Sequence, residues 1–172
     1  HGRGNVMLDL GRILLHGAVL SAIGSLLIMS AVYLNPRFVR KDLPRDIQDA
    51  TPPLTRKERL QASAFAIPFF ALCIGIPLVS ALTLQSPGNG HVPFFTLFIH
   101  IFGVILVFNL VDLFILDWLI YCRITPRFVV IPGTEGFAGY KDFGHQFRAH
   151  IRGTILMVVL SFLLAGIVAL LR

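Results

Sequence analysis

Four long apolar stretches, separated by loops that carry most of the charge, dominate the pattern of this chain. The longest uncharged stretch lies between Arg59 and Asp112 and contains no Asp, Glu, Lys or Arg. The turn-forming residues 85–90 divide it, which predicts two helices joined by a short hairpin. Residues 13–36 and 153–171 are two further uncharged runs. Each has the length of about 20 residues that a helix needs to cross a hydrocarbon core.

The composition supports a membrane protein. Hydrophobic residues make up 55% of the chain and charged residues only 14%, whereas about a quarter of a soluble globular domain is charged. We therefore predict an all-α polytopic membrane protein, a single domain of residues 1–172 with four transmembrane helices in a bundle. The expected spans are residues 13–34, 64–84, 94–120 and 154–171, and the expected long loops are residues 35–63 and 121–153.

The positive charge is concentrated in the two long loops. The net charge is +6, and 12 of the 15 Lys and Arg residues lie in these loops, whereas the hairpin has none. Because cytoplasmic loops carry the excess of Lys and Arg, the pattern predicts a protein of the cytoplasmic membrane, with both long loops inside and both termini outside. The same distribution gives no indication of nucleic-acid binding.

Local signals predict how the spans begin and pack. Gly17, Ser21, Gly24 and Ser25 place small side chains on neighbouring turns of the first span, which favours close approach of another helix. Residues 55–58, Thr-Arg-Lys-Glu, form a capping box and predict a helix start at Thr55. Residues 44–50 predict a short helix in the first long loop.

Asp112 is the acidic residue that the membrane makes most costly, because it lies inside the third span. Asn109 shares its helical face, so the pair could bind a cation, relay a proton or hold a lipid headgroup. The alternative, which we favour, is a structural ion pair between Asp112 and an Arg of the long loops. Asp117, five residues on, should be turned by about 140° on an α-helix, so the two carboxylates should not share a face.

Histidines form a second candidate group. His16 and His100 lie at similar depth in different spans, and His91 in the predicted hairpin is a possible third ligand. Imidazoles at one depth could ligate a haem or a metal. Their spacing matches no known motif, so we expect His16 and His100 to be structural and expect no metal or other cofactor.

Residues 140–152 have the pattern of an amphipathic helix at the membrane surface. Phe143, Phe147 and Ile151 share one face, and basic side chains lie elsewhere. This combination is typical of a helix on an anionic leaflet. The residues expected in this surface helix are Lys141, Phe143, Phe147, Arg148, Ile151 and Arg152. We also expect Glu135, His145 and His150, which match no catalytic spacing, to be surface residues.

Two segments of the long loops carry a resemblance. The first runs from Asn35-Pro36-Arg37 through Pro44-Arg45-Asp46-Ile47-Gln48 to Thr55-Arg56-Lys57-Glu58-Arg59, and the second from Asp117-Trp118 to Pro132-Gly133-Thr134-Glu135-Gly136. They resemble segments of uncharacterised small prokaryotic membrane proteins with four helices. The resemblance covers most of the chain and implies the four-helix architecture, but no activity.

No catalytic motif accompanies the four spans. We therefore expect a non-catalytic membrane protein that self-associates or serves as an accessory subunit of a larger membrane complex. One alternative is a small transporter or channel subunit that uses Asn109 and Asp112. Another is a membrane enzyme, or a haem- or metal-binding membrane protein. The expected partners are the lipid bilayer with its anionic headgroups and, as alternatives, a second copy of the chain or a larger complex; no nucleic acid is expected.

Overall fold

The computed structural model describes residues 8–85 and 91–171, and every regular element in these ranges is helical. The long helices are α1 (Leu10–Leu34), α3 (Arg56–Leu82), α4 (Phe94–Val111) and α5 (Phe143–Leu171). The π-helix η3 (Asp112–Ile124) continues α4. The shorter elements are the 3-10 helices η1 (Pro36–Asp42), η4 (Arg127–Val129) and η5 (Ala138–Lys141), and the α-helix α2 (Arg45–Ala50). The predicted all-α four-helix membrane bundle is confirmed.

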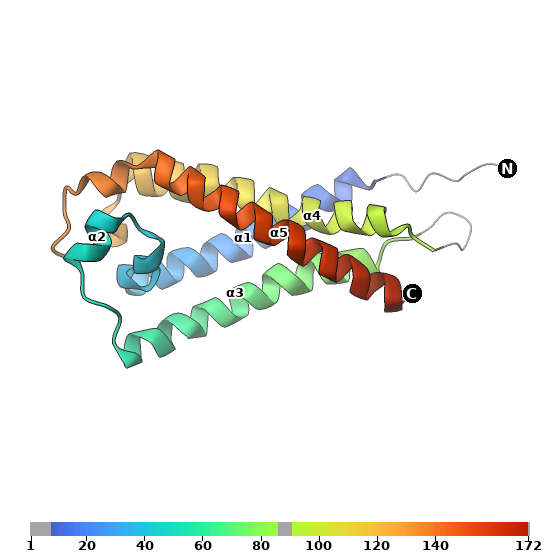
Figure 1. Ribbon diagram of the computed structural model, residues 1–172, viewed down its shortest axis with the longest axis horizontal. Coiled ribbons are helices and arrows are strands. Elements are labelled where there is room, and N and C mark those ends of the chain that lie inside the picture. The colour runs from blue at the N-terminus through green and yellow to red at the C-terminus, as the bar shows by residue number, and fades with distance from the viewer. Residues whose placement is uncertain (1–7, 86–90, 172) are drawn as a thin grey trace.

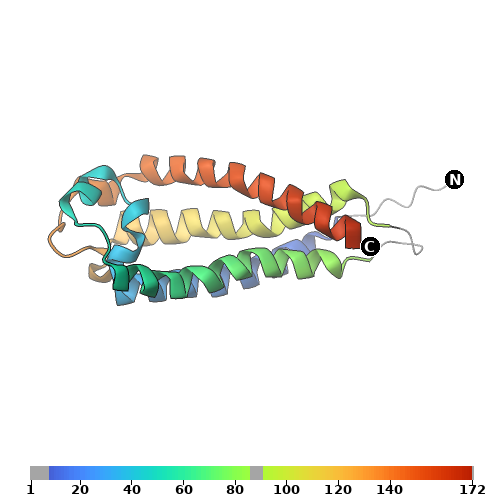
Figure 2. The same ribbon diagram turned by 60° about the horizontal axis from the view of Figure 1, so that its bottom comes forward.

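The four long helices run side by side and leave the two long connections at one end of the bundle (Figures 1 and 2). We call this the loop end. At the opposite end, which we call the terminal end, α1 begins, α3 ends, α4 begins and α5 ends. This arrangement agrees with the predicted order of spans, in which both long loops lie at the same end of the bundle. Residues 86–90 of the predicted hairpin lie outside the described residues.

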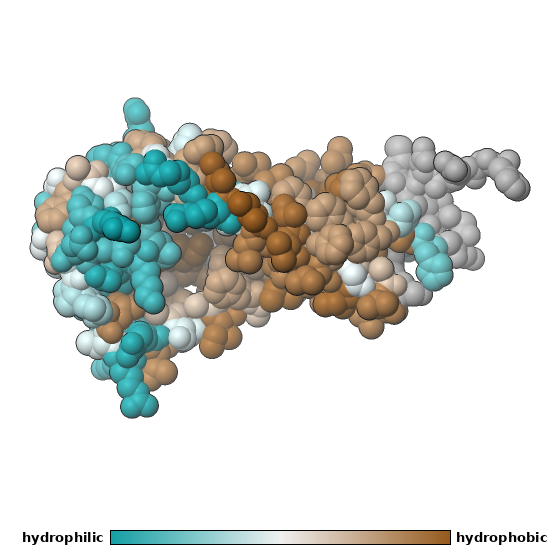
Figure 3. Space-filling model, in the orientation of Figure 1, coloured by the Kyte–Doolittle hydropathy of each residue, from teal (hydrophilic) through white to brown (hydrophobic). Residues whose placement is uncertain are grey.

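The outer surface of the bundle is apolar along most of its length. Figure 3 shows hydrophilic residues gathered at the loop end and hydrophobic residues along the rest of the bundle. Large side chains such as Leu26, Ile67 and Leu156 are more than half exposed. All four long helices, with η3 counted as part of the third, are long and apolar enough to cross a membrane. Exposed apolar surface of this extent fits contact with lipid tails.

Small residues allow α1 to lie close to α4, as predicted. A Cβ atom on Gly17 would lie 2.5 Å from the Cβ atom of Val107, and one on Gly24 would lie 3.0 Å from the Phe108 ring. Ser21 is buried between these two glycines, and its hydroxyl donates to the Gly17 carbonyl oxygen over 2.7 Å. Gly17, Ser21 and Gly24, which we call the small-residue stripe, therefore form a surface against which α4 packs closely.

Helix α3 begins as its sequence predicts. The Glu58 N–H donates to the Thr55 hydroxyl over 3.2 Å, and the Glu58 carboxylate accepts from the Thr55 N–H over 2.8 Å. This reciprocal capping box satisfies backbone donors that a helix start leaves unpaired. The helix then continues through Pro68 and Pro77 to Leu82.

The third span changes its winding at Asp112. Residues 112–124 are π-helical, and the segment ends with the Thr125 N–H donating to the Ile120 carbonyl oxygen over 2.8 Å. Hydrogen bonding from i to i+5 brings residues five apart onto one face. The expectation that Asp112 and Asp117 point in different directions is therefore wrong, because it assumed an α-helix.

The two long loops fold against each other and close the loop end. We call residues 35–55 and 125–142 the cap. Its Gly139 N–H donates to the Asp46 carboxylate over 2.9 Å. Its core combines buried side chains from both loops and from the adjoining helices: Val32, Leu43, Ile47, Tyr121, Val129, Ile131 and Tyr140.

Helix α5 runs without a break from the cap to the terminal end. The predicted amphipathic helix is thus present from Phe143 onward, but it starts three residues later than expected and is continuous with the fourth span. This continuity agrees with the expectation that the segment leads directly into the fourth span. Residues 138–141 instead form the 3-10 turn η5.

Candidate functional site

Four polar side chains from three elements meet near the loop end. The His150 imidazole of α5 hydrogen-bonds the Asn109 side chain of α4 through Nδ1 over 3.0 Å. Its Nε2 hydrogen-bonds the Asp117 carboxylate over 2.9 Å and lies 3.8 Å from a carboxylate oxygen of Asp112. We call these four residues the loop-end cluster. One imidazole thus connects an amide with two carboxylates.

The local structure explains how these residues meet. Asn109 lies in the last turn of α4, and the π-helical winding that follows places Asp112 and Asp117 together toward α5. His150 lies two turns into α5, on the side that packs against α4 and η3, and its side chain is only 10% exposed. The cluster therefore depends on the π-helix as much as on the choice of residues.

A cavity of about 170 Å³ adjoins the cluster. Asp112 and Asp117 line it together with Asp42 of η1, Tyr121 of η3 and Gln146 of α5. The Tyr121 residue is 5% exposed, and its hydroxyl has no hydrogen-bond partner among the described residues. A buried hydroxyl without a partner beside a cavity favours a water molecule or a ligand there.

Asp42 adds a third carboxylate from the cap. Although part of the residue is exposed, the surrounding protein raises the pKa of its carboxyl above the ordinary value of 3.8. Burial is the largest cause and repulsion by Asp117 is the second. His145 and Lys41 act in the opposite direction and lower this pKa. Asp42 is therefore easier to protonate than an ordinary surface aspartate.

The side chains that line the cavity carry more negative than positive charge. Three carboxylates line the cavity, and no Lys or Arg is among the residues that line it. A protonated His150 can neutralise one carboxylate only. The Asp112 carboxylate accepts no hydrogen bond from any described residue, and its nearest cationic partner is His150 rather than an Arg. The expected Arg partner is therefore wrong, and the surplus of carboxylates favours uptake of a proton.

A second polar group lies at the terminal end. The Ser80 hydroxyl of α3 hydrogen-bonds His16 Nδ1 on α1 and His100 Nε2 on α4, each over 2.6 Å. The sequence placed these histidines at one depth, and the structure connects them through a serine. A serine hydroxyl has one proton, so it can donate to only one imidazole at a time. Hydrogen bonding therefore couples the tautomers of the two histidines.

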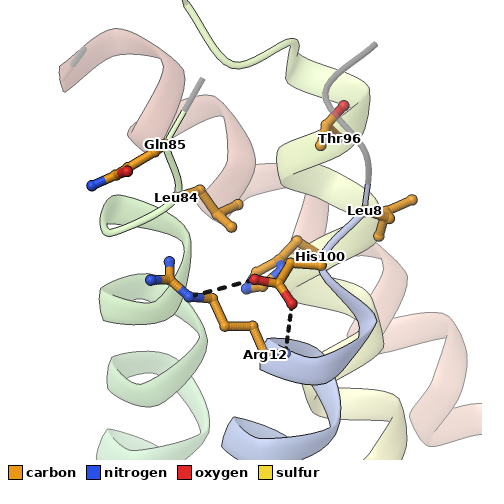
Figure 4. A pocket seen from close by; sticks show the side chains of 7 residues that line it. Leu8, Arg12, Leu84, Gln85, Thr96 and His100 are labelled. Carbon is orange, nitrogen blue, oxygen red and sulfur yellow. Dashed lines mark hydrogen bonds and ion pairs between the residues drawn. The ribbon is translucent and has the colours of Figure 1, made fainter. Parts of the chain in front are cut away.

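A pocket of about 210 Å³ opens next to this group (Figure 4). Arg12 and His100 line it from α1 and α4, and Thr96 and Gln85 add polar groups. His100 is 1% exposed, and its Nδ1 atom has no partner among the described residues. The Arg12 guanidinium donates to the Thr83 carbonyl oxygen over 2.7 Å.

The other predicted residues lie apart from both groups. His91 is exposed, and the hydrogen bonds of the His16 and His100 side chains go to Ser80 rather than to His91. In residues 8–85 and 91–171, no three His, Cys, Asp or Glu side chains are arranged to hold a metal ion.

The residues of the predicted surface helix lie around the start of α5. The Phe143 and Phe147 rings contact Trp118, with ring centroids 6.0 and 6.5 Å apart, and Ile151 is half exposed. Lys141 donates to the Thr125 hydroxyl over 2.7 Å, and Arg148 lies 3.9 Å from Asp142. Arg152 is exposed. Phe143, Phe147 and Ile151 thus lie on one partly exposed face of α5.

Sequence reasoning missed three members of these groups. His150 was assigned to the surface, although it lies three residues before an uncharged run, where a polar side chain can reach into the bundle. Ser80 and Asp42 carry no sequence signal of their own, because their roles arise only from helix packing.

No protein-family model, no curated protein and no solved structure matches this chain.

Proposed function

We propose that this protein is a small membrane transporter, or the ion-handling subunit of one, in which the loop-end cluster takes up and releases a proton. The observation that carries the proposal is the single His150 imidazole within reach of both Asp117 and Asp112, beside a cavity with a third carboxylate. Ionisable groups at such positions in transmembrane helices typically belong to ion or proton paths. π-helical segments are likewise frequent at functional sites.

The terminal-end group supports the same proposal. His16, Ser80 and His100 can pass a proton along their hydrogen bonds. Helix α4 carries His100 near one end and Asn109 near the other, and the buried apolar residues Val104, Ile105 and Phe108 lie between them. A proton-coupled protein with polar groups at both ends and an apolar barrier between them would open to one side at a time.

We also propose that the loop end faces the cytoplasm, with both termini outside. The support is the excess of Lys and Arg in the two long loops. In this orientation the loop-end cluster exchanges protons with the cytoplasm. The terminal-end pocket faces the external side.

Proton flux into liposomes tests the proposed function. Purified protein is reconstituted into vesicles that contain a pH-sensitive dye, and a proton gradient is applied with valinomycin and potassium to balance the charge. The wild-type protein should conduct protons faster than protein-free vesicles. Asp117→Asn and His150→Gln should each lower the protein-dependent rate about 100-fold, because each removes a group that transfers the proton.

Asp49→Asn is the matched control, because Asp49 is exposed on α2 and lies outside the cavity. It should keep the wild-type rate. Equal rates for the wild-type protein and both cluster variants would contradict the proposal. Absence of wild-type flux, together with no carboxyl band that titrates in infrared difference spectra, would contradict it as well.

A further inference from the structure

Between α1 and α3, on the side of the bundle toward the loop end, lies an apolar groove of about 170 Å³. Leu27 and Ala31 of α1, Phe65 and Phe69 of α3, and Phe38 of η1 line it, and every lining side chain is apolar. The groove lies within the part of α1 and α3 that is long and apolar enough to span a membrane. It therefore offers a surface that a hydrocarbon chain can fill.

A basic pocket of about 320 Å³ continues this groove toward the cap. Arg40, Lys41 and Arg59 line it, together with Pro53, Leu54 and Ser63. Ala62 lines both the pocket and the groove, so the two adjoin each other at α3. A third cavity, of about 260 Å³, shares Phe38 and Phe65 with the groove and extends it along α3.

None of the three cations of the basic pocket forms an ion pair in the described part of the chain, although Lys41 neighbours Asp42 and lowers the pKa of its carboxyl. The ion pairs there include Arg37 with Glu58 at 2.8 Å, but none involves Arg40, Lys41 or Arg59. Arg40 is held in place because its Nε atom donates to the Thr51 carbonyl oxygen over 3.0 Å and to the Thr51 hydroxyl over 2.9 Å. Three positive charges with no acid among the lining residues complement a phosphate group.

From this adjacency of charge and apolar surface we infer that one anionic phospholipid binds here, with its phosphate among Arg40, Lys41 and Arg59 and an acyl chain in the groove beside Phe65 and Phe69. The cations lie at the level of the headgroups, where the apolar part of α3 begins. The site differs from the basic face of α5, because it combines charge with an enclosed apolar surface.

Native mass spectrometry of the full-length protein in detergent micelles tests this inference, with phosphatidylglycerol or phosphatidylcholine added at equal concentration. The wild-type protein should retain one phosphatidylglycerol and no phosphatidylcholine. The double variant Lys41→Gln/Arg59→Gln should bind phosphatidylglycerol about 30-fold more weakly, because two charges near the phosphate are lost. Ala66→Phe should also weaken binding without changing the charge, because Ala66 lines the groove.

Arg148→Gln/Arg152→Gln is the matched control, since it removes two exposed cations from α5. It should retain phosphatidylglycerol as the wild-type protein does. Equal weakening in this control would show general surface attraction and overturn the inference, as would wild-type retention by Lys41→Gln/Arg59→Gln. Displacement of the lipid by an equal concentration of glycerol 3-phosphate, which has no acyl chain, would overturn the role of the groove.

Discussion

At the scale of single residues, the charge of Asp42 affects the stability of the cap. The pKa of its carboxyl is raised, mainly by burial and then by Asp117. A raised pKa in the folded protein means that the folded state holds this proton more tightly than the unfolded chain does. The contribution of Asp42 to stability is therefore largest below the ordinary pKa of about 4 and is lost as the pH rises through the raised pKa.

Asp42→Asn should remove this dependence, because an amide does not ionise. The unfolding temperature of Asp42→Asn relative to that of the wild-type protein should rise as the pH increases from about 4 to about 7. Thermal unfolding in detergent at several pH values measures the difference. A difference that is constant, or that falls with increasing pH, would contradict the assignment.

At the scale of single residues, the sequence predicted only some members of the loop-end cluster. Asp112 and Asn109 were predicted as a polar site because the sequence places them inside an apolar span, where burying polar side chains costs free energy. Their partner, His150, was not predicted, because it lies 41 residues from Asn109 in the chain and only helix packing brings the two together. Sequence predicts which polar groups are costly, and packing decides which of them meet.

At the scale of elements, the close contact of α1 and α4 depends on Gly17. Gly17→Ala should lower the free energy of unfolding by about 2 kcal/mol, because the added methyl group would overlap Val107. Val107→Ala in the same protein should restore part of the loss. Reversible unfolding in mixed micelles measures both effects.

Gly75→Ala provides the comparison, because a Cβ atom there meets nothing within 4 Å. This helical substitution should be neutral or stabilise α3 by about 0.5–1 kcal/mol. If Gly17→Ala and Gly75→Ala had the same effect, the small-residue stripe would not be the reason that the helices lie close.

The elements differ in how well sequence predicts them. The start of α3 was predicted correctly, because a capping box depends on residues within one turn. The π-helix η3 was not predicted, because nothing in its residues distinguishes i→i+5 from i→i+4 hydrogen bonding. The error then carried over to the relative orientation of Asp112 and Asp117.

At the scale of the whole molecule, the proposed orientation can be tested by labelling. In a protein without Cys73 and Cys122, single cysteines at positions 45 and 141 should resist a membrane-impermeant thiol reagent added to intact cells. A cysteine at position 89, which lies in the predicted hairpin, should react. This pattern follows from the positive charge of the long loops.

Permeabilised cells supply the control, because positions 45 and 141 are exposed and should then react. The opposite pattern in intact cells would reverse the orientation. It would also place the loop-end cluster on the external side.

The unbroken course of α5 has a mechanical consequence. The helix is in contact with the cap through His145, whose imidazole hydrogen-bonds the Asp42 carbonyl oxygen over 2.9 Å, and one and a half turns later it carries His150. Because α5 is continuous between these two points, a displacement of the cap at Asp42 would be transmitted along the helix to His150. The Nε2 atom of His150 lies 2.9 Å from Asp117 and 3.8 Å from Asp112, so a small shift of the helix would change which carboxylate is nearer.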